Sequence, residues 1–85
     1  MENKVLVKLI VPELNKEYDI FLPINKKIGN IIILLNKTLN EFSNGTYPIS
    51  NTNSLYNIDT KKKYDIDVQL YNTDIRNGTR LMIIS

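Results

Sequence analysis

The most informative part of this sequence is LYNTDIRNGTRLMII, residues 70–84. Its first half is a mostly polar connection in which Leu70 and Ile75 are the side chains expected to enter a core. Asn77-Gly78 is a strong turn signal, because both residue types tolerate the backbone conformations of tight turns. The stretch therefore predicts a connection held down at two points and followed by a tight turn.

The last five residues of that stretch alternate in the manner of a β-strand. Leu81 and Ile83 share one face, which we assign to the core, while Met82 and Ile84 share the outer face. The sequence stops one residue later, at Ser85. We therefore expect the chain to end in the sheet, without a flexible tail.

The start of the chain predicts a β-hairpin. Two stretches alternate between apolar and mixed positions with a period of two, and they are separated by Pro12 and the polar residues 13–16. Proline cannot donate to a ladder, so the turn is expected there. The apolar positions assigned to the inner face are Val5, Val7, Leu9, Val11, Tyr18, Ile20 and Leu22.

After Pro23 the apolar period lengthens to that of a helix. One stripe of this helix holds Ile28, Ile31, Ile32, Leu35, Leu39 and Phe42. We expect Asn25 to be the N-cap. Asn44-Gly45 should end the helix, since glycine adopts the left-handed conformation at little cost.

The rest of the chain predicts a polar loop over residues 46–53 and two more short strands before the last one. The third strand carries Tyr56 and Ile58, and the fourth spans residues 64–68, after a lysine-rich turn. The order is then ββαβββ. This order predicts a single α+β domain over residues 1–85, with the helix packed across one face of a mixed sheet and the first and last strands parallel.

The composition indicates a soluble protein of the cytoplasm. Eleven Lys or Arg residues and nine acidic residues give a formal net charge of +2 that is spread evenly, so neither half is a basic arm for nucleic acid. The absence of cysteine suits a reducing compartment. The first residues carry charges inside their apolar stretch, unlike a signal peptide. The longest apolar run, Ile31–Leu35, is too short for direct membrane insertion.

Residues 70–84 resemble the pattern of leucine, isoleucine, glycine and leucine that precedes the final strand of ubiquitin-like (β-grasp) domains. The stretch LPINKKIGNII, residues 22–32, is similar to the strand-to-helix junction of the same fold. Length and overall sequence most resemble the YukD/EsaB-like proteins of Gram-positive bacteria, small cytoplasmic proteins linked to type VII (WXG100) secretion systems. The resemblance implies a non-conjugating accessory or regulatory protein that binds secretion-system components.

Catalytic chemistry is poorly supplied, and we expect no enzyme activity, no cofactor and no metal site. Without His or Cys there is no Ser-His pair, no thiol nucleophile and no ordinary zinc site. Asp65 and Asp67 would share one face of the expected fourth strand. Solvated acids that protect an exposed edge explain this pair better than acid–base catalysis does.

Two alternatives to an accessory protein are a carrier and a nucleic-acid-binding protein. A ubiquitin-like carrier or modifier needs a flexible tail that ends in Gly-Gly, and no glycine follows Gly78. Nucleic acid would be bound at Lys61-Lys62-Lys63, but three nearby aspartates offset that charge. A solvated turn is the better interpretation, and we expect no nucleic-acid partner.

A surplus of apolar side chains falls on the sheet face away from the helix. Contiguous exposed apolar side chains mark association surfaces, and the resemblance implies that partners meet this face. The expected protein-binding face consists of Leu6, Lys8, Ile10, Phe21, Met82 and Ile84. It would serve either a protein partner or self-association. Ile33 and Leu34 lie off the core stripe of the helix and are either exposed or covered by the 43–53 loop.

Overall fold

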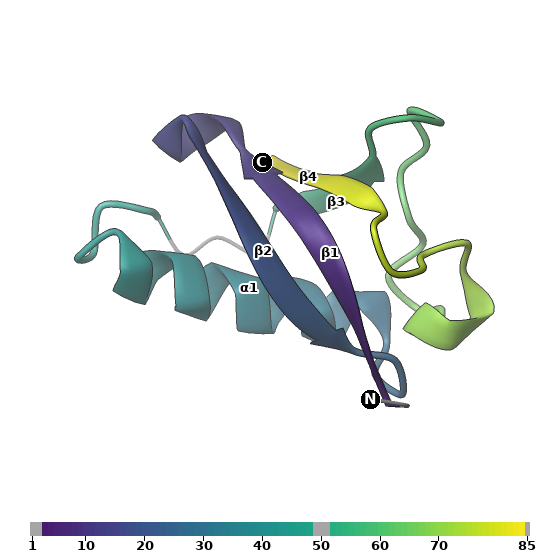
Figure 1. The fold of residues 1–85 in the computed structure, drawn as a ribbon. Helices are drawn as coiled ribbons and strands as arrows, with labels where there is room; N and C mark the ends of the chain where they lie inside the picture. Colours follow the sequence, from purple (N-terminus) through teal and green to yellow (C-terminus); the bar gives the residue numbers. More distant parts are fainter. Residues whose placement is uncertain (1–2, 49–51, 85) are drawn as a thin grey trace.

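The computed structural model describes residues 3–48 and 52–84 (Figure 1). The elements in chain order are β1 (Lys4–Val11), the 3-10 turn η1 (Pro12–Leu14), β2 (Lys16–Pro23), α1 (Ile28–Phe42), β3 (Ser54–Asn57), the 3-10 turn η2 (Leu70–Asn72) and β4 (Arg80–Ile84). Ser85, where the chain was expected to end in the sheet, lies outside the described residues. The same is true of residues 49–51 in the 43–53 loop.

The four strands form one mixed sheet in the order β2-β1-β4-β3. β1 pairs antiparallel with β2 and parallel with β4, and β3 pairs antiparallel with β4. Helix α1 crosses one face of this sheet (Figure 1). The predicted α+β fold, its N-terminal hairpin and the parallel pairing of the first and last strands are confirmed.

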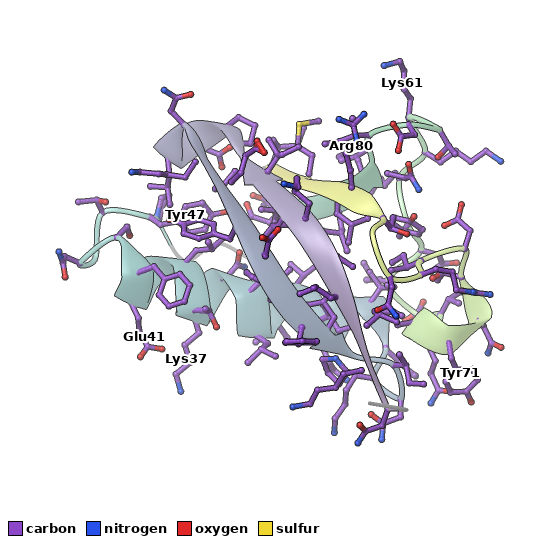
Figure 2. All side chains as sticks on the ribbon, in the orientation of Figure 1. Lys37, Glu41, Tyr47, Lys61, Tyr71 and Arg80 are labelled. Atoms are coloured by element: carbon purple, nitrogen blue, oxygen red, sulfur yellow. The ribbon has the colours of Figure 1, made fainter. Side chains whose placement is uncertain are left out.

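The core lies between the sheet and α1. Leu81, the second residue of β4, is fully buried, and so are the expected anchors of the last connection, Leu70 and Ile75. On the opposite side of the helix, Lys37 and Glu41 project away from the sheet (Figure 2). The buried apolar side chains of the strands and helix are Val7, Leu9, Val11, Leu22, Ile28, Ile31, Ile32, Leu35, Leu39, Leu55, Leu81 and Ile83.

The helix begins differently from the prediction. Lys27, not Asn25, is the N-cap residue, and it makes no side-chain capping hydrogen bond. The first N–H groups of a helix have no partner within it. Here the N–H of Ile28 donates to the carbonyl of Val68 at 2.9 Å, and that of Gly29 donates to the carbonyl of Ile66 at 2.9 Å. Backbone carbonyls from a distant loop therefore replace the capping side chain.

The expected fourth strand over residues 64–68 is not a strand, so the regular elements are ββαββ, not ββαβββ. Only isolated bridges at Lys63 and Gln69 flank the segment. The chain turns because its carbonyls meet the helix start, where Gly29 allows the approach: an added Cβ would lie 3.2 Å from the Ile66 carbonyl oxygen. Asp65 accepts a hydrogen bond from the N–H of Asp67 at 2.9 Å, so the two acids form a local turn.

The third strand starts earlier than expected, and Ile58 lies beyond its end. Leu55 and Asn57 face the core, which places Tyr56 on the other side. Asn57 is a buried polar residue whose Oδ1 accepts hydrogen bonds from the N–H groups of Asp59 (2.8 Å) and Thr60 (3.0 Å). This one side chain shapes the turn after β3.

Asn57 also joins a short polar network. Its Nδ2 donates to the Tyr64 hydroxyl at 3.0 Å, and that hydroxyl donates to Asp74 Oδ1 at 2.6 Å. Burial, together with the hydrogen bond to Asp74, raises the pKa of Tyr64 to about 12. The hydroxyl therefore stays protonated and ties the β3 turn to the connection before β4.

The loop after the helix contributes to the core, which the sequence did not predict. Tyr47 is fully buried, and its hydroxyl accepts a hydrogen bond from Asn53 Nδ2 at 2.9 Å. Asn53 Nδ2 also donates to Asn36 Oδ1 on the helix. Phe42, assigned to the core stripe, is instead 57% exposed and lies against the ring of Tyr18 at a centroid distance of 5.4 Å.

Candidate protein-binding face

The side of the sheet away from α1, here called the outer face, carries all six residues of the expected binding face. Each of them alternates along its strand with a buried residue. Leu6 is 39% exposed and Phe21 is 52% exposed, and Lys8 is exposed as well. Ile10, Met82 and Ile84 are half-buried. Strand periodicity therefore placed these side chains correctly.

Leu6 and Phe21 form the first of two apolar patches on the outer face, the Phe21 patch. They are direct partners across the β1–β2 ladder, where side chains of opposite residues lie close together. A surface depression runs beside them, and Lys4, Lys8 and Asp19 contribute to its lining. The depression is therefore apolar beside Leu6 and Phe21 and is bordered by charged side chains of both signs.

Asn77 and Gly78 hold the Phe21 patch in position. The N–H of Leu6 donates to Asn77 Oδ1 at 2.8 Å, and the N–H of Gly78 donates to the Leu6 carbonyl at 2.8 Å. Gly78 has a φ of +89°, where a side chain would be strained. The sequence predicted this turn, but not that its asparagine side chain extends the hydrogen bonding of β1 beyond the start of β4.

We expect Asn77→Ala to lower the free energy of unfolding by about 1 kcal/mol, because the Leu6 N–H loses its acceptor. Asn77→Asp is the matched control, since its carboxylate oxygen keeps that acceptor. Urea titration followed by circular dichroism measures both variants. Equal losses in the two variants would show that the hydrogen bond to Leu6 is not the cause.

Ile10, Met82 and Tyr56 lie in one row across β1, β4 and β3 and begin the second patch, the Met82 patch. Ile58 and Ile84 complete it around a mainly apolar depression. Sequence reasoning missed Tyr56 and Ile58 as part of this face. The alternation of Tyr56 and Ile58 was visible in the sequence, but the polar Asn57 between them does not look like a core residue, so the side of β3 that faces the core was not recognised.

A row of charged side chains separates the two patches. Lys8 Nζ lies 3.9 Å from Asp19 Oδ1, and Arg80 Nη2 donates to Asp59 Oδ1 at 2.6 Å. Lys8 and Arg80 are neighbours across the β1–β4 ladder, so the row runs acid, base, base, acid. The hydrogen bond from Arg80 holds the pKa of Asp59 below its usual value. Such exposed pairs add little stability, so their main effect is on which surface can dock here.

Solved structures resemble this arrangement over nearly the whole chain. A chain of the ESX-5 inner membrane complex matches with a TM-score of 0.78 and 22% identity, over 96% of this chain and 21% of that one. The EccD5 ubiquitin-like domain from Mycobacterium xenopi matches with a TM-score of 0.76 and 17% identity, over 95% and 92% of the two chains. The ubiquitin-like domain of EccD1, a Mycobacterium tuberculosis type VII secretion system protein, matches with a TM-score of 0.73 and 16% identity, over 96% and 98%.

The chain has the ubiquitin-like fold. At these identities the likeness establishes the fold, and the present chain spans only about a fifth of the first neighbour's length. Comparison with protein-family models and with curated proteins gave no match. The fold-level resemblance seen in residues 70–84 is thereby confirmed.

Four other features of this ubiquitin-like domain bear on the sequence predictions. Ile33 is 68% exposed and Leu34 is 48% exposed, so neither is covered in the described structure. The three lysines at 61–63 are exposed. Over residues 3–48 and 52–84, no cluster of three or more acidic, His or Cys residues could hold a metal ion. No helix in these ranges is long and apolar enough to cross a membrane.

Proposed function

We propose that this ubiquitin-like domain acts by binding a protein through its outer face, without catalysis. The observation that carries the proposal is the apolar surface on a sheet face that no other described element covers, with Leu6 and Phe21 substantially exposed and the Met82 patch beside them. Exposed apolar groups gathered on one face mark an association surface. The charged row between the patches supplies the polar complementarity that gives such surfaces specificity.

The proposed setting is a type VII (WXG100) secretion system of a Gram-positive bacterium, with this domain as a cytoplasmic YukD/EsaB-like accessory protein. Two kinds of support exist. The sequence resembles YukD/EsaB-like proteins, and two structural neighbours are EccD domains, one of them described as a type VII secretion system protein. The proposed partners are therefore secretion-system components.

We expect Leu6→Asp and Met82→Asp each to reduce binding to the secretion system's membrane components by at least about tenfold, because a carboxylate in an apolar interface is left unpaired. The measurement is co-purification of the tagged domain with the membrane ATPase and its associated subunits from the same bacterium. Asn30→Asp is the matched control, since Asn30 is exposed on α1, away from the outer face.

Each outcome of this experiment has a defined meaning. Undiminished binding by both folded variants would refute the outer face as the binding site. Unfolded variants would show that these side chains belong to the core. Sedimentation velocity of the isolated domain tests self-association. A dimer that dissociates when Leu6→Asp or Met82→Asp is introduced would show that the outer face binds a second copy.

A further inference from the structure

The two margins of the sheet differ in whether their backbone groups are paired. At the β3 margin, the N–H of Tyr64 donates to the carbonyl of Leu55 at 2.9 Å, and the N–H of Asn57 donates to the carbonyl of Lys62 at 2.9 Å. The N–H of Lys61 donates to the Asn57 carbonyl at 2.8 Å. Residues 61–64 therefore close this margin, and a further strand has no place to pair.

The β2 margin is open, and the direction of its backbone groups follows from the ladder. The N–H of Lys8 donates to the carbonyl of Thr79, and the carbonyl of Leu6 accepts from Gly78, so even-numbered residues of β1 bond toward β4. Odd-numbered residues of β1 consequently bond toward the even-numbered residues of β2 that lie opposite them. The backbone N–H and C=O groups of the odd-numbered residues of β2 must point away from the sheet.

Three residues present these outward groups: Glu17, Asp19 and Phe21. Pro23 follows in the same alignment, but it has no N–H to donate. In the described parts of the chain, β2 has β1 as its sole strand neighbour, and it forms one margin of the sheet (Figure 1). This margin therefore offers three donors and their carbonyls at the spacing of a strand.

Side chains on both sides of this margin suit an added strand. On the outer face, the side chains nearest the margin are Glu17, Asp19 and Phe21. On the helix side, the half-buried Tyr18 contacts the exposed Phe42, so the last turn of α1 lies beside β2. Leu34 is two helical turns earlier on the same flank as Phe42 and is 48% exposed. A strand laid along β2 would cover apolar side chains below and meet carboxylates above.

We propose that the β2 margin binds an extended peptide segment with lysine or arginine at alternate positions, which adds to the sheet as a fifth strand. Strand addition takes its affinity from main-chain hydrogen bonds and its specificity from alternate side chains. The cations would lie directly opposite Glu17 and Asp19, where opposite charges stabilise a strand pair and like charges destabilise it. The intervening positions would place apolar side chains against the Phe42 flank.

A second copy of this chain fits the same margin poorly. The antiparallel register centred on the three outward residues sets Asp19 opposite Asp19, which is repulsive. A shift by one repeat sets Glu17 opposite Asp19 in one direction, and opposite Pro23, which lacks an N–H, in the other. Charge therefore favours a basic partner over self-pairing.

The test uses a capped octapeptide of alternating valine and lysine, with the matched valine–glutamate peptide as the comparison. We expect the lysine peptide to slow hydrogen exchange at the amides of Glu17, Asp19 and Phe21 by at least about tenfold at saturation. The glutamate peptide at the same concentration should leave these amides unprotected. A lysine peptide N-methylated at its pairing positions separates strand addition from simple charge attraction, because it keeps the charge and loses the hydrogen bonds.

A variant of the domain with reversed charges on β2 provides the second part of the test. Glu17→Lys combined with Asp19→Lys should reverse the peptide preference, with each affinity changing by about tenfold or more. Asp19→Lys places a lysine opposite Lys8, but both substituted side chains are exposed to solvent, which screens that repulsion, so the fold should persist, and the amide spectrum checks this. Equal binding of both peptides, equal binding of the N-methylated peptide, or spectral changes centred on the Met82 patch would each overturn the proposal. Met82→Asp changes the outer face and leaves the β2 margin intact. Failure of peptide binding at β2 is therefore distinct from failure of the outer-face proposal.

Discussion

Leu81→Ala is expected to lower the free energy of unfolding by about 3–5 kcal/mol, whereas Met82→Ala at the next position should lower it by less than about 1.5 kcal/mol. Leu81 is fully buried in a strand that has neighbours on both sides, so truncation leaves a cavity. Met82 is half-buried on the outer face, where water can fill the space. The comparison tests the facing of β4 with two adjacent positions.

Urea denaturation monitored by circular dichroism measures both variants. Small domains have about 5–15 kcal/mol of stability in all, so Leu81→Ala removes a large share of it. Ile83→Val serves as the graded control, with an expected loss of about 0.5–1.5 kcal/mol for one methylene. A loss at Met82 as large as that at Leu81 would mean that the outer face is covered, and would exclude it as a docking surface.

Asn57→Ala should lower the free energy of unfolding by about 2–4 kcal/mol, which is unusual for an asparagine. The substitution removes the acceptor of two backbone N–H groups, from Asp59 and Thr60, and the donor to the Tyr64 hydroxyl. The hydrogen bond to Tyr64 is buried, and a buried polar group left without a partner costs about 1–3 kcal/mol, whereas the two N–H groups belong to exposed residues and add a smaller loss. The measurement is again equilibrium unfolding, with the amide spectrum reporting whether the turn after β3 is retained.

A double-mutant cycle with Tyr64→Phe separates the network from its parts. If Asn57 and Tyr64 act as one unit, the double variant loses less than the sum of the single losses, by about 0.5–3 kcal/mol. Strict additivity would mean that Asn57 acts only through the turn N–H groups. The single variant Tyr64→Phe should cost less than Asn57→Ala, because Asp74 is exposed and water can replace the hydroxyl.

The hairpin and the last strand were predictable because their apolar residues alternate strictly over several positions. That pattern fixes which side of a strand faces the core, and it placed Leu6, Phe21 and Met82 on the outer face. It carries no information about register between distant strands. The charged row through Lys8 and Arg80, which depends on the parallel pairing of β1 with β4, was therefore not foreseen.

Residues 64–68 were assigned to a strand because Tyr64, Ile66 and Val68 alternate with two aspartates. In the structure, the backbone of this segment bonds to the start of α1 instead of to a neighbouring strand. The start of α1 lacks a capping side chain, and the carbonyls of Ile66 and Val68 satisfy its N–H groups instead. Such a long-range requirement leaves no periodic trace in the sequence.

The buried polar residues are the second feature that could not be predicted from the sequence. Asn53 and Tyr47 fall in the expected polar loop and Asn57 lies between the expected strand residues Tyr56 and Ile58, yet all three are buried and hydrogen-bonded. Phe42 shows the reverse error, since its position fits the helical stripe but lies past the part of α1 that faces the core. Periodicity identifies a stripe, but the extent of the sheet beneath it decides how far that stripe is buried.

The capping of α1 by the 66–68 loop means that segments outside the helix hold it at both ends. Its first turn is joined by backbone hydrogen bonds to a segment that leads directly into the anchored Leu70. Its last turn is held by the buried side chain of Leu39 and by Asn40, whose Nδ2 donates to the carbonyl of the buried Tyr47 at 2.7 Å. The backbone is thus fixed at both ends of the helix, and what can adjust to a bound segment beside the open β2 margin is the exposed side chain of Phe42.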